Sequence, residues 1–180
     1  MTHEKDEYAI VLDYLPHGYP LEGKMTPIVQ AIGEKHLALL QLVPSKGSSF
    51  ILNEKVYIGS GKRDKIYYII GRLPEDKITE TAKIQLQKFI ETVVAEQEKR
   101  FIDFFNTAQA INTRLHRLEL LPGFGKKHTK EILSSRQEKL FESFDDIKQR
   151  VKGIPDPQKA VEKRIYEEIM EKPRQILFVN

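Results

Sequence analysis

A short run of glycines and lysines in the C-terminal half of the chain has the residue types and spacing to bind an anion. The run spans residues 121–127, Leu-Pro-Gly-Phe-Gly-Lys-Lys. Pro122 cannot continue helical hydrogen bonding, and Gly123 and Gly125 tolerate a positive φ or the close approach of another backbone. If a helix begins after Gly125, its first N–H groups point outward at the positive end of the helix dipole, where a phosphate oxygen is stabilised.

Segments with helical periodicity flank this turn. Upstream, four apolar residues recur at spacings of 3, 4 and 3 and predict a helix with one apolar face: Ala108, Ile111, Leu115 and Leu118. Downstream, Thr129, Ile132 and Leu133 form the inward face of a second predicted helix. The basic side chains are then left for solvent or a ligand: Lys126, Lys127, Lys130 and Arg136. Contacts of this kind reach the sugar-phosphate backbone and indicate binding without sequence preference.

Two interpretations of the turn remain open from the residues alone. A Pro-Gly-x-Gly sequence between amphipathic helices is also compatible with a tight helix–helix corner, and lysines after it with a solvated face. His128, in the first helical turn, either helps to hold a phosphate or simply covers the turn.

The same residues resemble a known motif. Residues 121–127, followed by Thr129 and Ile132, resemble the helix-hairpin-helix of DNA repair, recombination and translation-linked proteins, many of which carry Ala in place of Thr129. The whole chain resembles a small archaeal family of uncharacterised proteins, domain of unknown function 655. That resemblance implies nucleic-acid binding through a β-barrel domain followed by this motif, and it supplies no known reaction.

Composition limits the classes of function. The chain has 180 residues and no cysteine, which excludes disulfides, thiolate metal sites and cysteine nucleophiles and fits a cytoplasmic protein. Its longest nearly apolar run, residues 37–43, is too short to span a bilayer. Residues 1–7 contain no apolar stretch typical of a secretion signal. We therefore expect no membrane association.

The charge is unevenly distributed along the chain. Lys plus Arg outnumber Asp plus Glu by 15 to 11 over residues 108–180 and by 9 to 8 over residues 1–74, whereas acids outnumber bases by 7 to 5 over residues 75–107. The basic excess lies in the segment that contains the turn, as a phosphate-backbone binder requires. Because the excess is small, weak and salt-sensitive binding is expected.

The N-terminal part predicts β structure. Short apolar and aromatic runs indicate four strands over residues 8–14, 36–43, 55–58 and 65–70, separated by Gly, Pro and Ser. Short strands with this punctuation favour a small β-barrel resembling an oligonucleotide-binding (OB) fold.

A second basic and aromatic cluster falls in this part of the chain. Lys62, Arg63, Lys65 and Tyr67 suggest a further nucleic-acid surface on which bases could stack, although tyrosine is also common in strands for packing reasons. Residues 59–62, Gly-Ser-Gly-Lys, do not form a phosphate-binding P-loop, because the spacing, the next residue and the following strand are all wrong for one. A hairpin turn explains these glycines.

The remaining sequence predicts helices. Apolar residues from Ile78 to Ala108 trace one face of a long bridging helix, interrupted by the polar residues 96–100. Ser143 and Asp146 predict a helix start. Residues 151–155, Val-Lys-Gly-Ile-Pro, then lie 30 residues after the first turn and suggest the second half of a tandem helix-hairpin-helix domain, with Gly153 as a further contact.

Asp156 and Pro157 predict the start of a last helix ending near Pro173, with Lys159, Lys163 and Arg164 outward. The tail, residues 176–179, is expected to add an edge strand or to dock in a groove.

A catalytic alternative rests on spacing. In one DNA glycosylase superfamily the motif is followed by an aspartate about 20 residues on, and some members use a lysine of the hairpin as nucleophile. Lys127 and Asp145 have about this spacing, but Asp145 fits the first turn of a helix, where acids are favoured. No metal site is predicted, since the five histidines are scattered: His3, His17, His36, His116 and His128.

The sequence thus predicts an α+β protein in three parts: an OB-like β-barrel over residues 1–74, a long bridging helix over 75–107 and an all-α tandem helix-hairpin-helix domain over 108–180. The predicted function is nucleic-acid binding without catalysis, cofactor or metal. A protein-interaction adaptor in a DNA- or RNA-processing or translation complex is the main alternative. The predicted contacts are Gly123, Phe124, Gly125, Lys126, Lys127, His128, Lys130 and Gly153.

Overall fold

The structure of the chain, a computed structural model, describes residues 5–23 and 25–179, and these fold into two compact units. The first unit contains residues 5–23, 25–89, 169–172 and 178–179, and the second contains residues 90–168 and 173–177. The division into residues 1–74, 75–107 and 108–180 stays a prediction.

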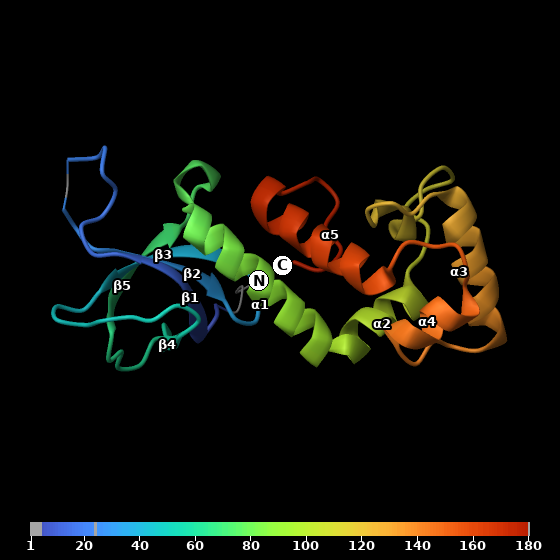
Figure 1. Ribbon diagram of the computed structural model, residues 1–180, viewed down its shortest axis with the longest axis horizontal. Helices are drawn as coiled ribbons and strands as arrows, with labels where there is room; N and C mark the ends of the chain where they lie inside the picture. The colour runs from blue at the N-terminus through green and yellow to red at the C-terminus, as the bar shows by residue number, and fades with distance from the viewer. Residues whose placement is uncertain (1–4, 24, 180) are drawn as a thin grey trace. The chain divides into compact units, whose positions relative to one another are not determined.

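The first unit is built on a five-stranded antiparallel sheet (Figure 1). Its spatial order is β4-β1-β2-β3-β5, and every pairing between neighbours is antiparallel. All four predicted strands are present, and β2 was not predicted. The strands are β1 (Tyr8–Leu15), β2 (Ile28–Gly33), β3 (Leu39–Pro44), β4 (Lys55–Tyr57) and β5 (Ile66–Arg72).

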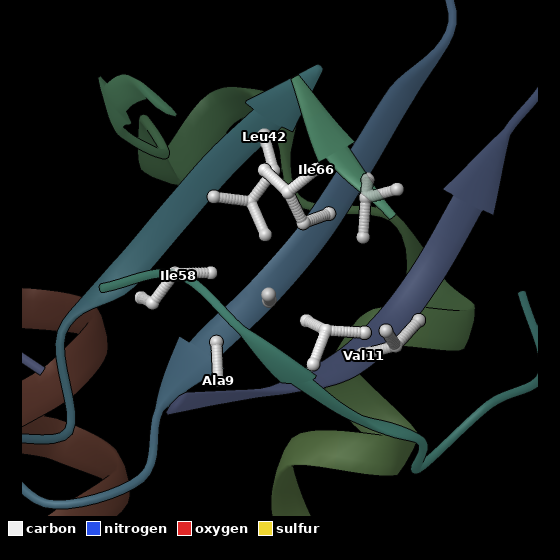
Figure 2. Close-up of a cluster of buried hydrophobic side chains, with 8 residues drawn as sticks. Ala9, Val11, Leu42, Ile58 and Ile66 are labelled. Carbon is white, nitrogen blue, oxygen red and sulfur yellow. The ribbon is translucent and has the colours of Figure 1, made fainter. Parts of the chain in front are cut away.

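Irregular pairing curls this sheet into a half-barrel. The register shifts between Val11 and Asp13 in the β1–β2 pair and twice in the β3–β5 pair, and such bulges bend a strand and increase its twist. Figure 2 shows the buried cluster of eight residues that fills the hollow, with Ile58 and Ile66 at opposite ends of the loop between β4 and β5.

The predicted OB-like barrel is wrong. The unpredicted strand β2, in which every residue is buried, lies in the centre of the sheet between β1 and β3. As a result β4 pairs with β1 and β5 pairs with β3, at opposite edges. The loop with Gly59 and Gly61 therefore connects the two edges of the sheet, and the expected hairpin turn is also wrong.

A buried polar network fixes the start of α1 (Glu80–Glu96) on this sheet. Gln30, fully buried on β2, donates to the carbonyl of Lys77 at 2.8 Å and accepts from Thr79 N at 3.1 Å. The Thr79 hydroxyl donates to Asp13 Oδ2 at 2.6 Å and accepts from Ala82 N, which caps the helix. Burial of these polar groups is tolerated because each is hydrogen-bonded. A short 3₁₀ helix, η1 (Glu75–Lys77), precedes this start.

The expected single bridging helix is two helices. α1 ends at Glu96, Gln97 leaves helical geometry with φ −106° and ψ 34°, and α2 (Glu98–Thr107) follows at a bend visible in Figure 1. The side chain of Glu98 accepts from Phe144 N at 2.8 Å, which joins the first turn of α2 to that of a later helix. The break falls within the polar interruption noted in the sequence.

The second unit does not contain the predicted tandem helix-hairpin-helix domain, because the first of its four expected helices is absent. Residues 108–116 form an irregular loop closed by an isolated bridge between Ala110 and His116. Asn112 Oδ1 accepts from the N–H groups of Arg114 and Leu115, at 2.8 and 2.9 Å. Such a side chain-to-backbone turn competes directly with helical hydrogen bonding. Only the 3₁₀ turn η2 (Arg117–Leu120) precedes the glycines.

The other predicted starts in this unit are confirmed. α3 (Lys126–Glu138) begins directly after Gly125. α4 (Phe144–Arg150) is capped by Ser143 Oγ, and α5 (Pro157–Glu171) by Asp156, whose Oδ1 accepts from Gln158 N and Lys159 N. The described residues thus contain five α-helices.

Two basic residues assigned to solvent or ligand are structural. Arg164 is 8% exposed and its Nε donates to Glu168 Oε2 at 2.8 Å, while its terminal nitrogens reach the carbonyls of Leu120 and Gln175. Arg136 donates to the carbonyl of Phe105 at 3.1 Å, at the end of α2. Both predictions of outward charge are therefore wrong. The tail, residues 176–179, forms no strand, so the edge-strand alternative is wrong.

Candidate nucleic-acid interface

The turn between η2 and α3 is held from both sides by buried apolar residues. Leu121 and Phe124 are 1% and 5% exposed, and Phe124 N donates to the carbonyl of Leu121 at 3.0 Å. Gly123 has φ +84°, a conformation that side chains with a Cβ rarely adopt. A Cβ at Gly123 would lie 3.1 Å from Cγ of Pro155, so the turn also packs closely against the second turn of the unit.

Gly125 has a different part in the turn. Its backbone is extended, with φ −106° and ψ −169°, and a Cβ there would meet no atom within 4 Å. Its N–H donates to Nδ1 of His128 at 3.1 Å, and its carbonyl accepts from both the N–H and the hydroxyl of Thr129. The Gly125 N–H is thus already used inside the chain. The outward donors of this helix start are the N–H groups of Lys126, Lys127 and His128, which precede the first intrahelical bond.

An open groove of about 530 Å³ runs beside this helix start, between the 110–116 loop and α3. We call it the basic groove, because four cationic side chains and one acid, Glu119, line it. The cations are Arg114, Lys126, Lys127 and Lys130. Asn112 and Thr113 add polar groups, and Ala110, Leu115 and Leu133 add apolar ones.

Lys126 is committed to internal contacts. Its Nζ donates to the carbonyl of Arg114 at 2.6 Å and to Glu119 Oε1 at 3.1 Å. Glu119 also accepts from His116 N at 2.7 Å, and these hydrogen bonds, the one from His116 first, lower the pKa of Glu119. Lys126 therefore holds the loop against α3. Its ammonium group is less available to a ligand than the sequence implied, because Glu119 already pairs with it.

Lys127 and Lys130 are two cations of the groove whose side chains are not engaged by the described residues. Both are exposed, and neither side chain makes a hydrogen bond or ion pair with any residue that the structure describes. They stand in the first two turns of α3, the positive end of its dipole. Arg114, on the opposite wall, is exposed as well, and only its backbone is bonded.

Burial lowers the pKa of His116, which also lines the groove. The residue is 9% exposed, its Nδ1 accepts from Leu118 N at 3.1 Å, and desolvation together with the charge of Arg136 lowers its pKa. A neutral imidazole with an accepting Nδ1 closes the 3₁₀ turn η2. His116 is thus a support for the loop and not a contact for phosphate.

The structure brings together some of the predicted contact residues and separates others. Lys126, Lys127 and Lys130 line the basic groove, whereas the side chain of Phe124 is buried and His128 covers the turn. Gly153, in the second turn, has φ +80° and does not line the groove. Arg114, Asn112 and Thr113 were missed because the sequence pattern placed them in a helix. Asn112 itself was the available signal, because an Asn side chain can accept from the backbone two residues on and so favours a turn.

The second predicted surface lies in the first unit and has its own pocket. Lys65 is engaged, since its Nζ donates to Glu54 Oε1 at 2.8 Å and to the carbonyl of Ser49. Lys62 is exposed. Arg63 and Tyr67 line a polar pocket of about 440 Å³.

The features needed for the glycosylase alternative are not assembled at Lys127. Asp145 is exposed in the first turn of α4 and is not among the residues that line the groove. Within residues 5–23 and 25–179, three or more His, Cys, Asp or Glu side chains nowhere gather closely enough to hold a metal ion; His3 lies outside these residues. No helix in the same part of the chain is long and apolar enough to cross a bilayer.

The fold and the groove define a mixed α/β protein with an antiparallel half-barrel unit and a helical unit. Residues 5–180 match the family described as "Protein of unknown function (DUF655)", and the chain belongs to that family. It is 42% identical to the uncharacterised protein MJ0038 of Methanocaldococcus jannaschii over 177 residues, which are 97% of this chain and 80% of that protein. It is also similar to the crystal structure of the family member Af1531 from Archaeoglobus fulgidus. That similarity has a TM-score of 0.84 and 41% identity and covers 97% of this chain and 100% of the other.

Proposed function

We propose that the chain binds the phosphate backbone of nucleic acid, without sequence preference and without catalysing a reaction, through the basic groove. One observation carries the proposal: Lys127 and Lys130 stand unpaired beside the outward N–H groups of the α3 start, with Arg114 on the facing wall. Backbone N–H groups and cations that converge on one space are the usual means of holding a phosphate.

The groove supports contact with the backbone better than it supports the recognition of bases. Its cations are flexible lysines and one arginine on an open surface, and the turn beside it offers N–H donors, which carry no base code. The fold of this turn does not depend on a helix-hairpin-helix. A 3₁₀ turn, a positive-φ glycine and the buried Phe124 are enough to expose the start of α3.

The expected affinity is low and strongly dependent on salt. Non-specific binding through a few phosphates typically has a dissociation constant of about 10⁻⁴ to 10⁻⁶ M at physiological salt. Each neutralised phosphate of duplex DNA contributes about 0.9 to the slope of log affinity against log salt. Lys127 and Lys130 together are therefore expected to account for about 1.8 of that slope.

The test is a salt series of binding to single- and double-stranded DNA and RNA, comparing wild type with Lys127→Glu/Lys130→Glu. The variant is expected to lose affinity for every sequence alike and to show a shallower salt slope by about 1.8 on duplex DNA. Lys159→Glu/Lys163→Glu is the matched control, since it makes the same change of charge at exposed positions that do not line the groove.

Equal losses in the two double variants would show that only net charge matters, and the groove would then have no special role. The preferred polymer would identify DNA or RNA as the ligand. The cytoplasmic location remains part of the same proposal.

A protein-interaction adaptor is the second candidate, favoured by exposed apolar side chains on the edge strand β5. Tyr68 and Ile70 are 47% and 46% exposed at an edge that pairs with β3 only. Exposed strand edges are sites where an extended segment of a partner can pair. Wild-type protein that binds none of the four polymers at low salt would favour the adaptor over the nucleic-acid binder.

A further inference from the structure

The polar pocket at the start of β5 is distinct from the basic groove and shares no lining residue with it. It has a volume of about 440 Å³, within the range of small-ligand sites. Its lining combines two hydroxyl side chains, one guanidinium and one aromatic ring: Ser45, Ser60, Gly61, Arg63, Ile66 and Tyr67.

A bulge in the sheet exposes the aromatic ring. Pro44 pairs with Ile66 and Val43 pairs with Tyr68, so Tyr67 is an extra residue without a partner on β3. The bulge breaks the alternation along β5. Ile66 is buried, whereas Tyr67 and Tyr68 are 71% and 47% exposed. The Tyr67 and Tyr68 rings contact each other in a T-shaped arrangement, with centroids 5.5 Å apart and an interplanar angle of 76°. The Tyr67 ring is thus mostly exposed to solvent while a second ring supports it.

The charged wall of the pocket is oriented before any ligand arrives. Arg63 Nε donates to the carbonyl of Gly59 at 2.7 Å, and its terminal nitrogens have no partner among the residues the structure describes. The loop carrying Arg63 closes around Tyr57, whose hydroxyl accepts from Gly61 N at 3.0 Å. A Cβ at Gly59 would lie only 2.4 Å from that hydroxyl, so glycine is needed for this close approach. Ser45 is held opposite, because its N–H donates to the carbonyl of Lys65 at 2.8 Å.

We propose that this pocket binds one unpaired nucleotide of single-stranded nucleic acid. The base stacks on Tyr67, and the adjoining phosphate accepts from the terminal nitrogens of Arg63 and the hydroxyls of Ser45 and Ser60. Stacking on an aromatic side chain needs a base face that is free, which a base inside a duplex does not offer. The pocket therefore selects single strands, a preference that the backbone contacts of the basic groove do not supply.

The test is binding of fluorescently labelled eight-nucleotide oligothymidine and oligouridine, beside a blunt DNA duplex, to the full chain. Tyr67→Ala is expected to weaken single-strand binding by roughly 5- to 150-fold, the range for loss of one stacked base. Duplex binding is expected to change by less than about twofold, because a duplex presents no base to Tyr67. Ultraviolet crosslinking of the oligonucleotide is expected to label the peptide that contains Tyr67.

Two variants separate stacking from folding. Tyr67→Phe keeps the ring and is expected to retain single-strand affinity. Ile70→Ala removes an exposed apolar side chain of the same strand outside the pocket and is expected to bind as wild type does. Arg63→Gln is expected to reduce the salt slope on single strands by about 0.7, the contribution of one phosphate.

The inference fails if wild type binds no single strand, if Tyr67→Ala binds single strands as tightly as wild type, or if it loses single strand and duplex equally. The groove variant Lys127→Glu/Lys130→Glu distinguishes the two proposals. If this groove variant loses duplex binding but still binds single strands in a way that depends on Tyr67, both the groove proposal and the pocket proposal are supported. Tyr67-dependent single-strand binding without any duplex binding supports the pocket and leaves the groove without its ligand.

Discussion

Replacement of Gly123 by alanine tests whether the turn depends on one glycine or on two. Of the two glycines in the turn, only Gly123 has a positive φ, at +84°, and only at Gly123 would a Cβ meet a neighbour, Cγ of Pro155 at 3.1 Å. Gly125 is extended and its missing Cβ faces open space. Gly123→Ala and Gly125→Ala are therefore a matched pair two residues apart.

The expected cost of Gly123→Ala follows from these two features. The left-handed conformation costs a residue with a Cβ about 1–2 kcal/mol. The contact with Pro155 adds about 1 kcal/mol, because the proline ring must shift by a few tenths of an ångström. Reduced freedom of the unfolded chain returns about 0.4–1 kcal/mol. The net loss is about 1–3 kcal/mol of unfolding free energy, whereas Gly125→Ala is expected within about 0.5 kcal/mol of wild type, since small effects of either sign offset there.

The assay is native-state hydrogen exchange of the α3 amides, supported by urea titration followed by far-ultraviolet circular dichroism. Exchange is preferred because two compact units need not unfold together. Gly123→Ala/Pro155→Ala should recover the steric part, about 1 kcal/mol, in a double-mutant cycle. Equal costs for Gly123→Ala and Gly125→Ala would refute this account of the turn. Gly125→Ala should also retain nucleic-acid binding, because it keeps every N–H group.

Three further outcomes are expected. Asn106 accepts from Phe141 N at 2.8 Å and donates to the Phe141 carbonyl at 2.9 Å. Asn106→Asp sets a carboxylate against that carbonyl and should lower the free energy of unfolding in urea by about 1–3 kcal/mol; an unchanged free energy would contradict the paired contact. Glu168→Gln leaves the buried Arg164 without its counter-charge and should cost about 3–5 kcal/mol. Arg164→Met/Glu168→Leu leaves no unpaired charge but also removes the hydrogen bonds to Leu120, Gln175 and Leu177, so it should recover part of that loss; a double variant no better than the single would count against the burial argument. The lowered pKa of His116 means that the unfolded chain binds a proton more readily than the folded chain does. The contribution of His116 to the free energy of unfolding should therefore be fully present above pH 6.5 and fall as the pH decreases below it. His116→Asn should reduce this pH dependence, measured by urea titrations at about pH 7.5 and 5.5.

Local signals predicted the elements whose boundaries depend on nearby residues. Ser143 and Asp156 cap α4 and α5 as expected, since an N-cap needs only its own side chain and the next few N–H groups. Glycine after proline placed the start of α3 correctly for the same reason. Four strands were found from short runs of strand-forming residues bounded by Gly, Pro and Ser, which are also local signals.

The failures occurred where particular hydrogen bonds, some local and some between distant residues, decided the outcome against the apolar pattern. Helical periodicity over residues 108–118 was overridden by the turn at Asn112 and by the bridge from Ala110 to His116. Strand β2 was missed because Gln30 interrupts its apolar run, and the partners that make a buried glutamine acceptable, Lys77 and Thr79, lie far along the chain. Periodicity contains no information about such partners.

The candidate site was only partly accessible to sequence reasoning. The sequence determined that a basic, glycine-bordered helix start exists and that Lys127 and Lys130 stand on it, because residue type and helical spacing suffice for both. Only the tertiary structure decided that Lys126 is tied to Glu119, that Arg164 is buried, and that Arg114 faces the groove. Charge is a property of a residue, but its availability depends on what the fold places within a few ångströms.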